Sequence, residues 1–251
     1  MVSGLTVLWA GPVNFSQVGA ARVPGAAEVN LTCTGDGSPT CGQIADSFLS
    51  EGRRLPGILA AAGADPDSPV VVGAFSAGGS VAKRIGLSAA DRAQVVAMML
   101  ADATYTTTGA TGAEEGYVLY AMDAATDSSK LFVSTASSSP NKSHPSGIET
   151  QRILRAEVER RLGQDFRQTD PNALGVDPAP AAAWKLGNAL FLEYPDVPHG
   201  QQVTVLAERV WAATLLPWLD GSALTGASPR LLGALALGVG AGYLLWRGAR
   251  G

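Results

Sequence analysis

Short apolar runs of strand length alternate along the chain with segments of helical period, and this alternation limits the possible folds more than any other feature. Continuous apolar character over about four to eight residues is typical of a strand covered on both faces. The pattern predicts an α/β fold, in which helices cover both faces of a mostly parallel central sheet. The predicted strands are LTVLWA (5–10), PVVVGAF (69–75), AQVVAMMLAD (93–102), KLFVSTAS (130–137) and NALFLEY (188–194).

Helices are expected between these strands, at residues 42–64 with a break or kink at Pro56, and at 113–125, 147–163 and 200–219. Glu149 is expected to cap the start of the third of these helices. One face of that helix is apolar and carries Ile148, Ile153 or Leu154, Val158 and Leu162. The stretches 11–41 and 103–113, and the Pro/Ala-rich segment before residue 188, are predicted as loops.

Composition excludes one large class of function. The 251 residues are 46% apolar and 16% charged, which is ample material for a buried core. The formal net charge is −4, and no dense stripe of Lys and Arg occurs. Nucleic-acid surfaces need clustered positive charge, so we expect no nucleic-acid partner.

The C-terminal segment from Leu231 to Trp246 contains no charged residue. As a helix it would reach about 24 Å at 1.5 Å per residue, which is shorter than the ~30 Å hydrocarbon core. Snorkelling by the flanking arginines would let such a short span cross a membrane, and the spacing of Gly238 and Gly242 suits close helix packing in lipid. The alternative is self-association or packing against the domain. We therefore divide the chain into a domain (1–220), a linker (221–229) and an apolar helix (230–251) that is a possible membrane anchor.

The other terminus and the cysteines say less about location. The first residues, MVSGLTVLWAGPVN, lack the basic and long apolar regions of a signal peptide, so no signal peptide is expected. The two cysteines, Cys33 and Cys41, lie in a turn-rich stretch. They could form a small disulfide in an oxidising compartment or remain as thiols, and two thiols alone make a poor zinc site.

The stretch VVVGAFSAGGSVAKRIGL (70–87) places Ser76 between a predicted strand and a predicted helix. The residues two positions away on either side, Ala74 and Gly78, are small, as a sharp turn requires. A phosphate-binding loop has similar spacing, G-x-x-x-x-G-K-[ST], but Gly79 stands where that loop needs its lysine. A purely structural turn is a further alternative.

This strand, serine turn and helix resemble the nucleophile elbow of the α/β-hydrolase superfamily, Gly-x-Ser-x-Gly, with Ala74 in place of the first glycine. The resemblance covers residues 5–219 and implies an α/β-hydrolase-like fold with Ser76 as nucleophile. It also implies a histidine after the last strand. His199 lies at that position, whereas His144, the second of the two histidines, lies in a loop and either lines the pocket or is solvated.

The triad acid is harder to assign. The resemblance implies a carboxylate after the strand at 130–137, yet this strand runs into a series of serines. Asp102 ends the preceding strand, a known variation of the fold, and would orient His199; a turn aspartate is the alternative. Asp196 is too close to His199 in the chain to fold back easily. By the same resemblance, the oxyanion hole would use the N–H of Ala77 and that of Gly11 or Val13.

The expected function is that of a serine hydrolase acting on a small-molecule or lipid-like ester, with no cofactor and no metal. The alternative is a catalytically silent, hydrolase-like structural or assembly protein held by its C-terminal helix. The missing carboxylate after residue 137 supports this alternative.

Overall fold

The computed structural model describes most of the chain between residues 4 and 221. The predicted linker and apolar helix at 221–251 lie outside the described residues, apart from Gly221. Within the described part, no helix combines the length and the apolar character needed to cross a membrane. The described residues are 4–13, 23–33, 39–50, 54–105, 113–139 and 145–221.

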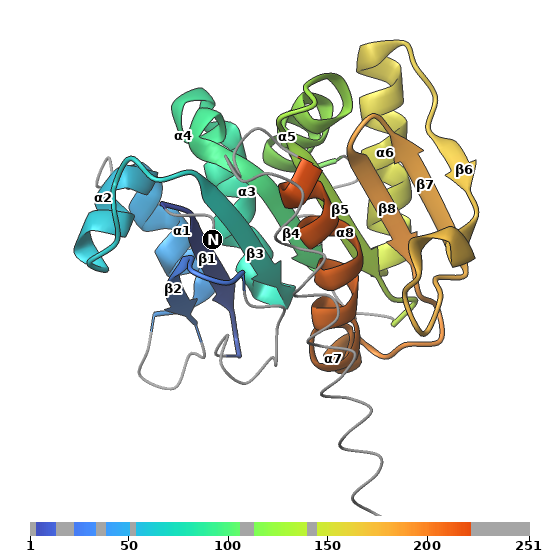
Figure 1. Ribbon diagram of the computed structural model, residues 1–251, viewed down its shortest axis with the longest axis horizontal. Coiled ribbons are helices and arrows are strands. Elements are labelled where there is room, and N and C mark those ends of the chain that lie inside the picture. The colour runs from blue at the N-terminus through green and yellow to red at the C-terminus, as the bar shows by residue number, and fades with distance from the viewer. Residues whose placement is uncertain are drawn as a thin grey trace, which may run out of the picture.

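An eight-stranded sheet forms the centre of the molecule, with the strand order β2-β1-β3-β4-β5-β8-β7-β6 (Figure 1). Every neighbouring pair from β2 to β8 is parallel, while β7 and β6 add antiparallel pairs at one edge. The predicted mostly parallel sheet is thus confirmed. The strands are β1 (Thr6–Gly11), β2 (Ala27–Thr32), β3 (Val70–Phe75), β4 (Val95–Ala101), β5 (Leu131–Ala136), β6 (Arg167–Thr169), β7 (Ala182–Leu186) and β8 (Ala189–Glu193).

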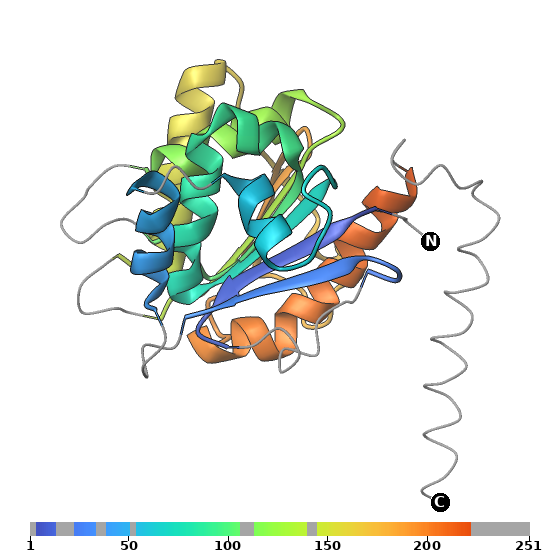
Figure 2. The same cartoon turned by 90° about the vertical axis from the view of Figure 1, so that its left-hand side faces the viewer.

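Helices cover both faces of this sheet. Figure 2 shows α8 on one face and α1, α3, α5 and α6 on the other. A π-helical turn at Gln202–Leu206 joins α7 to α8. The helices are α1 (Cys41–Ser50), α2 (Leu55–Ala61), α3 (Gly79–Leu87), α4 (Ala89–Gln94), α5 (Glu115–Thr126), α6 (Gly147–Leu162), α7 (His199–Gln201) and α8 (Ala207–Gly221).

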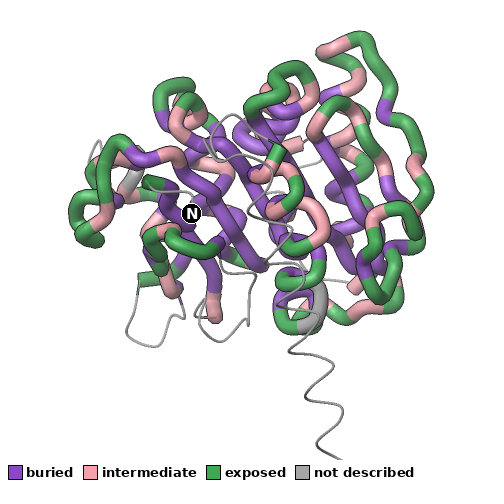
Figure 3. Tube along the Cα trace, viewed as in Figure 1, coloured by how far each residue is buried: buried purple, intermediate pink, exposed green. Residues whose placement is uncertain are grey.

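The central strands are buried on both sides, which explains their continuous apolar sequences (Figure 3). Along β3, Val71 and Phe75 belong to the core beneath α8, whereas Val70, Val72 and Ala74 belong to the core beneath the other helices. This alternation follows from the two-residue period of a strand. One continuous apolar run therefore supplies two separate cores.

Three strands were missed because their sequences lack an apolar run. The prediction of loops at 11–41 and before residue 188 was wrong where these strands lie. In β2 only Val29 is buried, since this edge strand pairs with β1 alone. The short strands β6 and β7 form the opposite, partly exposed edge. Edge strands bury less surface, so their sequences carry a weaker signal.

Several element boundaries also differ from the prediction. Residues 89–94 form α4, capped by the Ser88 side chain, so β4 begins at Val95 rather than at residue 93. The helix expected at 42–64 is two helices, and Pro56 lies in the first turn of α2, where a missing N–H costs nothing. The helix expected at 200–219 is divided by the π-helical turn.

The start of α6 agrees with the prediction. Ser146 and Glu149 form a reciprocal capping box, so the predicted capping role of Glu149 is confirmed. The predicted apolar face is also present, with Ile148, Leu154 and Val158 buried. Of the two alternatives at its centre, Leu154 rather than Ile153 is the buried residue.

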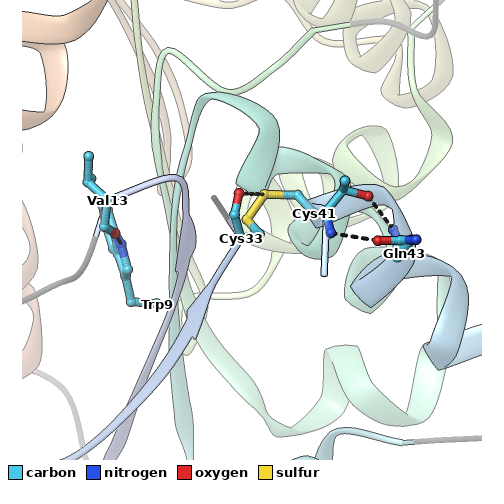
Figure 4. The surroundings of a disulfide bond; sticks show 6 residues. Trp9, Val13, Cys33, Cys41 and Gln43 are labelled. Atoms are coloured by element: carbon cyan, nitrogen blue, oxygen red, sulfur yellow. Dashed lines mark hydrogen bonds between the residues drawn. A yellow bond between two sulfur atoms is a disulfide. The ribbon is translucent and has the colours of Figure 1, made fainter. Parts of the chain in front are cut away.

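Cys33 and Cys41 form a disulfide that joins the segment after β2 to the first residue of α1 (Figure 4). The Cys33 N–H also donates a hydrogen bond to the carbonyl of Gly11 at 3.1 Å. Nearby, the indole N–H of Trp9 donates to the carbonyl of Val13 at 2.9 Å. The bridge therefore holds the chain after β2 to α1, and the two hydrogen bonds hold the chain where it leaves β1.

Candidate active site

Ser76 directly follows β3 and has a left-handed backbone, with φ of 52°. The chain passes through a 3₁₀ turn at Ser76–Gly78 into α3. A Cβ at Gly78 would lie 2.0 Å from the Ala10 carbonyl oxygen, and one at Gly79 would lie 2.0 Å from that of Ala103. Glycine is therefore required at both positions, and the position of Gly79 is explained by packing without any phosphate.

His199 meets Ser76 across the sheet end. It begins α7, which follows β8, and its Nε2 lies 2.9 Å from Ser76 Oγ. The Phe75 ring stacks against the imidazole with a centroid distance of 4.8 Å. The contact between these two side chains that the sequence predicted is therefore present, and the Phe75 ring supports one face of the imidazole.

Asp102 occupies the other side of the imidazole. Its Oδ2 lies 2.8 Å from His199 Nδ1, and its side chain is fully buried. Asp102 directly follows β4 and also has a left-handed backbone, with φ of 45°. Ser76, His199 and Asp102 are therefore joined in one chain of contacts. By contrast, Asp196 is exposed, and Glu149 is used in the cap of α6.

After β5, where the resemblance implies a carboxylate, a run of serines holds other groups of the site in place. Ser137 donates its hydroxyl to Asp102 Oδ2 at 2.5 Å and its N–H to Oδ1 at 3.2 Å. Ser138 donates its hydroxyl to the Pro195 carbonyl at 2.6 Å, and Ser139 Oγ accepts the N–H of His199 at 3.2 Å. This run therefore positions both the acid and the histidine loop. Sequence reasoning missed these roles, although the position of the run after a central strand was a usable signal.

The start of α6 closes over Asp102. A Cβ at Gly147 would lie 2.0 Å from Asp102 Oδ1, so only glycine allows the helix to approach this closely. The N–H of Ile148 donates to the Ser137 carbonyl at 3.1 Å, which holds the helix start against β5. The N-terminal end of a helix carries partial positive charge and favours a nearby carboxylate.

Tyr105 is a further member of the site that the sequence did not reveal. Its hydroxyl lies 3.0 Å from His199 Nδ1, the same nitrogen that contacts Asp102. Burial, followed by the negative charge of Asp102, raises the pKa of Tyr105 well above its usual value. The phenol is therefore neutral at any pH at which the protein would work. No local motif marks a tyrosine at this position.

Two of the predicted oxyanion donors lie beside the nucleophile, Ala77 in the chain and Gly11 in space. Ala77 follows Ser76 in the 3₁₀ turn. A Cβ on the next residue, Gly78, would lie 2.8 Å from the Gly11 nitrogen, so the end of β1 packs directly against this turn. Val13 is held at its carbonyl by Trp9. The donor roles of Ala77 and of Gly11 or Val13 remain predictions.

Three further observations bear on the site. In the ranges that the structure describes, no group of three or more His, Cys, Asp or Glu side chains is arranged to hold a metal ion. His144 lies outside the described residues. The comparisons with family models, with curated proteins and with solved structures gave no match. A function for this chain therefore depends on the geometry at the ends of β3, β4 and β8.

Proposed function

We propose that this chain is a serine hydrolase that cleaves an ester bond, with an α/β-hydrolase-like domain and a Ser76-His199-Asp102 triad. One observation carries the proposal: Ser76 Oγ lies 2.9 Å from His199 Nε2, while His199 Nδ1 lies 2.8 Å from Asp102 Oδ2. Both distances are within hydrogen-bond reach, as a nucleophile, its base and the group that orients the base require. The chain order Ser, Asp, His is also that of the superfamily.

In the proposed reaction, Ser76 Oγ attacks the ester carbonyl carbon while His199 Nε2 accepts the hydroxyl proton. The N–H groups of Ala77 and of Gly11 or Val13 stabilise the resulting oxyanion. His199 then returns the proton to the leaving alcohol, and an acyl group remains on Ser76. His199 then deprotonates a water molecule, which attacks the acyl carbon. The carboxylic acid leaves, and His199 returns the proton to Ser76 Oγ.

Asp102 acts through His199 in this scheme. Its carboxylate accepts a hydrogen bond from the Nδ1–H of His199, which leaves the lone pair of Nε2 directed at Ser76. It also stabilises the imidazolium that forms during attack. Because Asp102 is buried and hydrogen-bonded by Ser137, the imidazole meets a fixed carboxylate rather than a mobile one.

A fluorophosphonate probe tests the proposal, because an activated serine reacts covalently and a scaffold serine does not. We expect the wild-type protein to be labelled at Ser76, with the site located by peptide mass spectrometry. Ser76→Ala and His199→Ala should abolish labelling. Ser80→Ala, in the first turn of α3, is the matched control and should label like the wild type. If the folded wild-type protein does not label, the catalytically silent alternative is favoured.

The substrate class is proposed as small-molecule or lipid-like esters. A series of aryl esters with increasing acyl length, with the corresponding amide as a comparison, would define it by kcat/KM. We expect the ester to be cleaved faster than the amide. Membrane association through residues 231–246 remains a prediction about a segment outside the described residues.

A further inference from the structure

Tyr105 contacts the base of the proposed triad at the nitrogen that also contacts the acid. Its hydroxyl oxygen lies 3.0 Å from His199 Nδ1, and the two rings have a centroid distance of 5.8 Å with an interplanar angle of 59°. Asp102 Oδ2 lies 2.8 Å from the same nitrogen. One imidazole nitrogen therefore faces two oxygen atoms, and the position of the phenol proton decides what each oxygen does.

The hydrogen-bond inventory assigns this proton. An ionised carboxylate only accepts hydrogen bonds, and it has about four lone-pair sites. Asp102 receives the hydroxyl and the N–H of Ser137, and it contacts His199 Nδ1. Because a carboxylate only accepts, the Nδ1 atom 2.8 Å from Asp102 Oδ2 carries the proton, and the Tyr105 hydroxyl beside it cannot donate to it. The phenol oxygen then presents only lone pairs to Nδ1.

We propose that Tyr105 is a positioning residue that selects the Nδ1-protonated tautomer of His199 and so keeps Nε2 free to accept the proton of Ser76. The phenol oxygen and the carboxylate oxygen near Nδ1 then both act as acceptors. The opposite tautomer would place the Nδ1 lone pair against two oxygen lone pairs, which is unfavourable. The effect of Tyr105 on catalysis rests on the proposed hydrolase function, whereas the assignment of the tautomer does not.

The opposite arrangement makes a different prediction. If the phenol donated to Nδ1, Nε2 would carry the imidazole proton and could not accept one from Ser76. Tyr105 would then inhibit the resting site, and removing its hydroxyl would raise activity. The groups that face the imidazole in the described structure are Asp102, Tyr105, Ser76 and the Phe75 ring, so the only carboxylate among them is Asp102.

Tyr105→Phe removes only the hydroxyl and is the decisive variant. We expect kcat for ester hydrolysis to fall about tenfold, the effect of one charge-assisted hydrogen bond, while KM changes less than twofold. The rate of fluorophosphonate labelling should fall by the same factor. Tyr120→Phe is the matched control, because Tyr120 is a buried tyrosine whose hydroxyl donates to the Val95 carbonyl at the far end of β4. It should leave both rates unchanged.

Nitrogen NMR of ¹⁵N-histidine-labelled protein tests the tautomer without any substrate. The chain has two histidines, and the spectrum of His144→Gln identifies the signals of His199. We expect a protonated, pyrrole-type Nδ1 in the wild type and a mixture of tautomers in Tyr105→Phe. An unprotonated Nδ1 in the wild type would overturn the proposal, as would a kcat that is unchanged or raised in Tyr105→Phe. Failure of the wild type to label or to cleave esters would instead refute the hydrolase function.

Discussion

The ends of β3 and β4 carry the same unusual backbone for different reasons. These strands are neighbours in the sheet, and each is followed by a non-glycine residue in the left-handed region, Ser76 with φ of 52° and Asp102 with φ of 45°. Such a conformation costs about 1–2 kcal/mol for a residue with a Cβ. Strain of this kind is concentrated at functional sites and is maintained by surrounding contacts.

At the end of β3, backbone contacts maintain the conformation. The turn packs so closely on Ala10 and Ala103 that positions 78 and 79 must be glycine. At the end of β4, side-chain contacts dominate: Asp102 is held by Ser137, Gly147 allows α6 to approach it, and His199 lies against it. A turn that needs glycines at fixed positions in its own segment leaves a motif in the sequence, whereas a turn held by distant side chains does not.

The largest effect is expected where Asp102 acts on His199. Asp102→Asn should lower kcat for ester hydrolysis by about 10⁴-fold, because an amide at this position allows the wrong imidazole tautomer. Circular dichroism should show an unchanged fold. Asp91→Asn is the matched control, since Asp91 is also buried and accepts a hydrogen bond from the Leu55 N–H. It should reduce stability but leave kcat unchanged; a loss of less than tenfold in Asp102→Asn would contradict the assigned acid.

A smaller effect is expected where α6 approaches the acid. In Gly147→Ala, the new methyl group would lie 2.0 Å from Asp102 Oδ1, so the carboxylate must move. A misplacement of about 1 Å costs roughly 10²-fold in rate, and we expect a loss of that size in kcat. Gly57→Ala in α2, where a methyl group would meet nothing within 4 Å, should have no effect on kcat. Equal rates for both variants would show that α6 does not constrain the acid.

Next in size is the contribution of the serine that anchors the acid. Ser137→Ala removes the hydroxyl that donates to Asp102 Oδ2, and kcat should fall about tenfold because the carboxylate loses a charge-assisted hydrogen bond. Ser134→Ala on β5 provides the comparison, since its hydroxyl accepts from buried Gln151 Nε2 at 2.7 Å. Thermal unfolding should detect destabilisation in Ser134→Ala, with kcat retained. If Ser134→Ala lowered kcat and Ser137→Ala did not, Ser137 would have no role in the site.

The smallest effect distinguishes the two strained turns directly. Ser76→Gly should be more stable than Ser76→Ala by about 1 kcal/mol, because glycine adopts the left-handed conformation without strain. For Asp102→Gly against Asp102→Ala, the difference should be less than half as large, because either variant lacks the carboxylate that holds the turn and its backbone can relax. Denaturant unfolding measures both pairs. Equal differences at the two positions would show that backbone contacts maintain both turns.

Much of the central architecture was predictable from the sequence. The five buried strands were recognised because both faces are covered, so their apolar character is continuous. The edge strands β2, β6 and β7 were not, because part of their surface is exposed and polar residues are tolerated there. Likewise, α4 is short, and its residues are mostly polar or small.

For the site, the serine turn and the position of His199 after the last parallel strand could be predicted from the sequence alone, because each is a local pattern in the chain. The contact of Asp102 with His199, and the places of Ser137, Gly147 and Tyr105 around these two residues, became apparent only in the folded structure. These groups come from separate segments, and no spacing in the chain encodes their contacts. They are brought together because parallel strands all end at the same edge of the sheet.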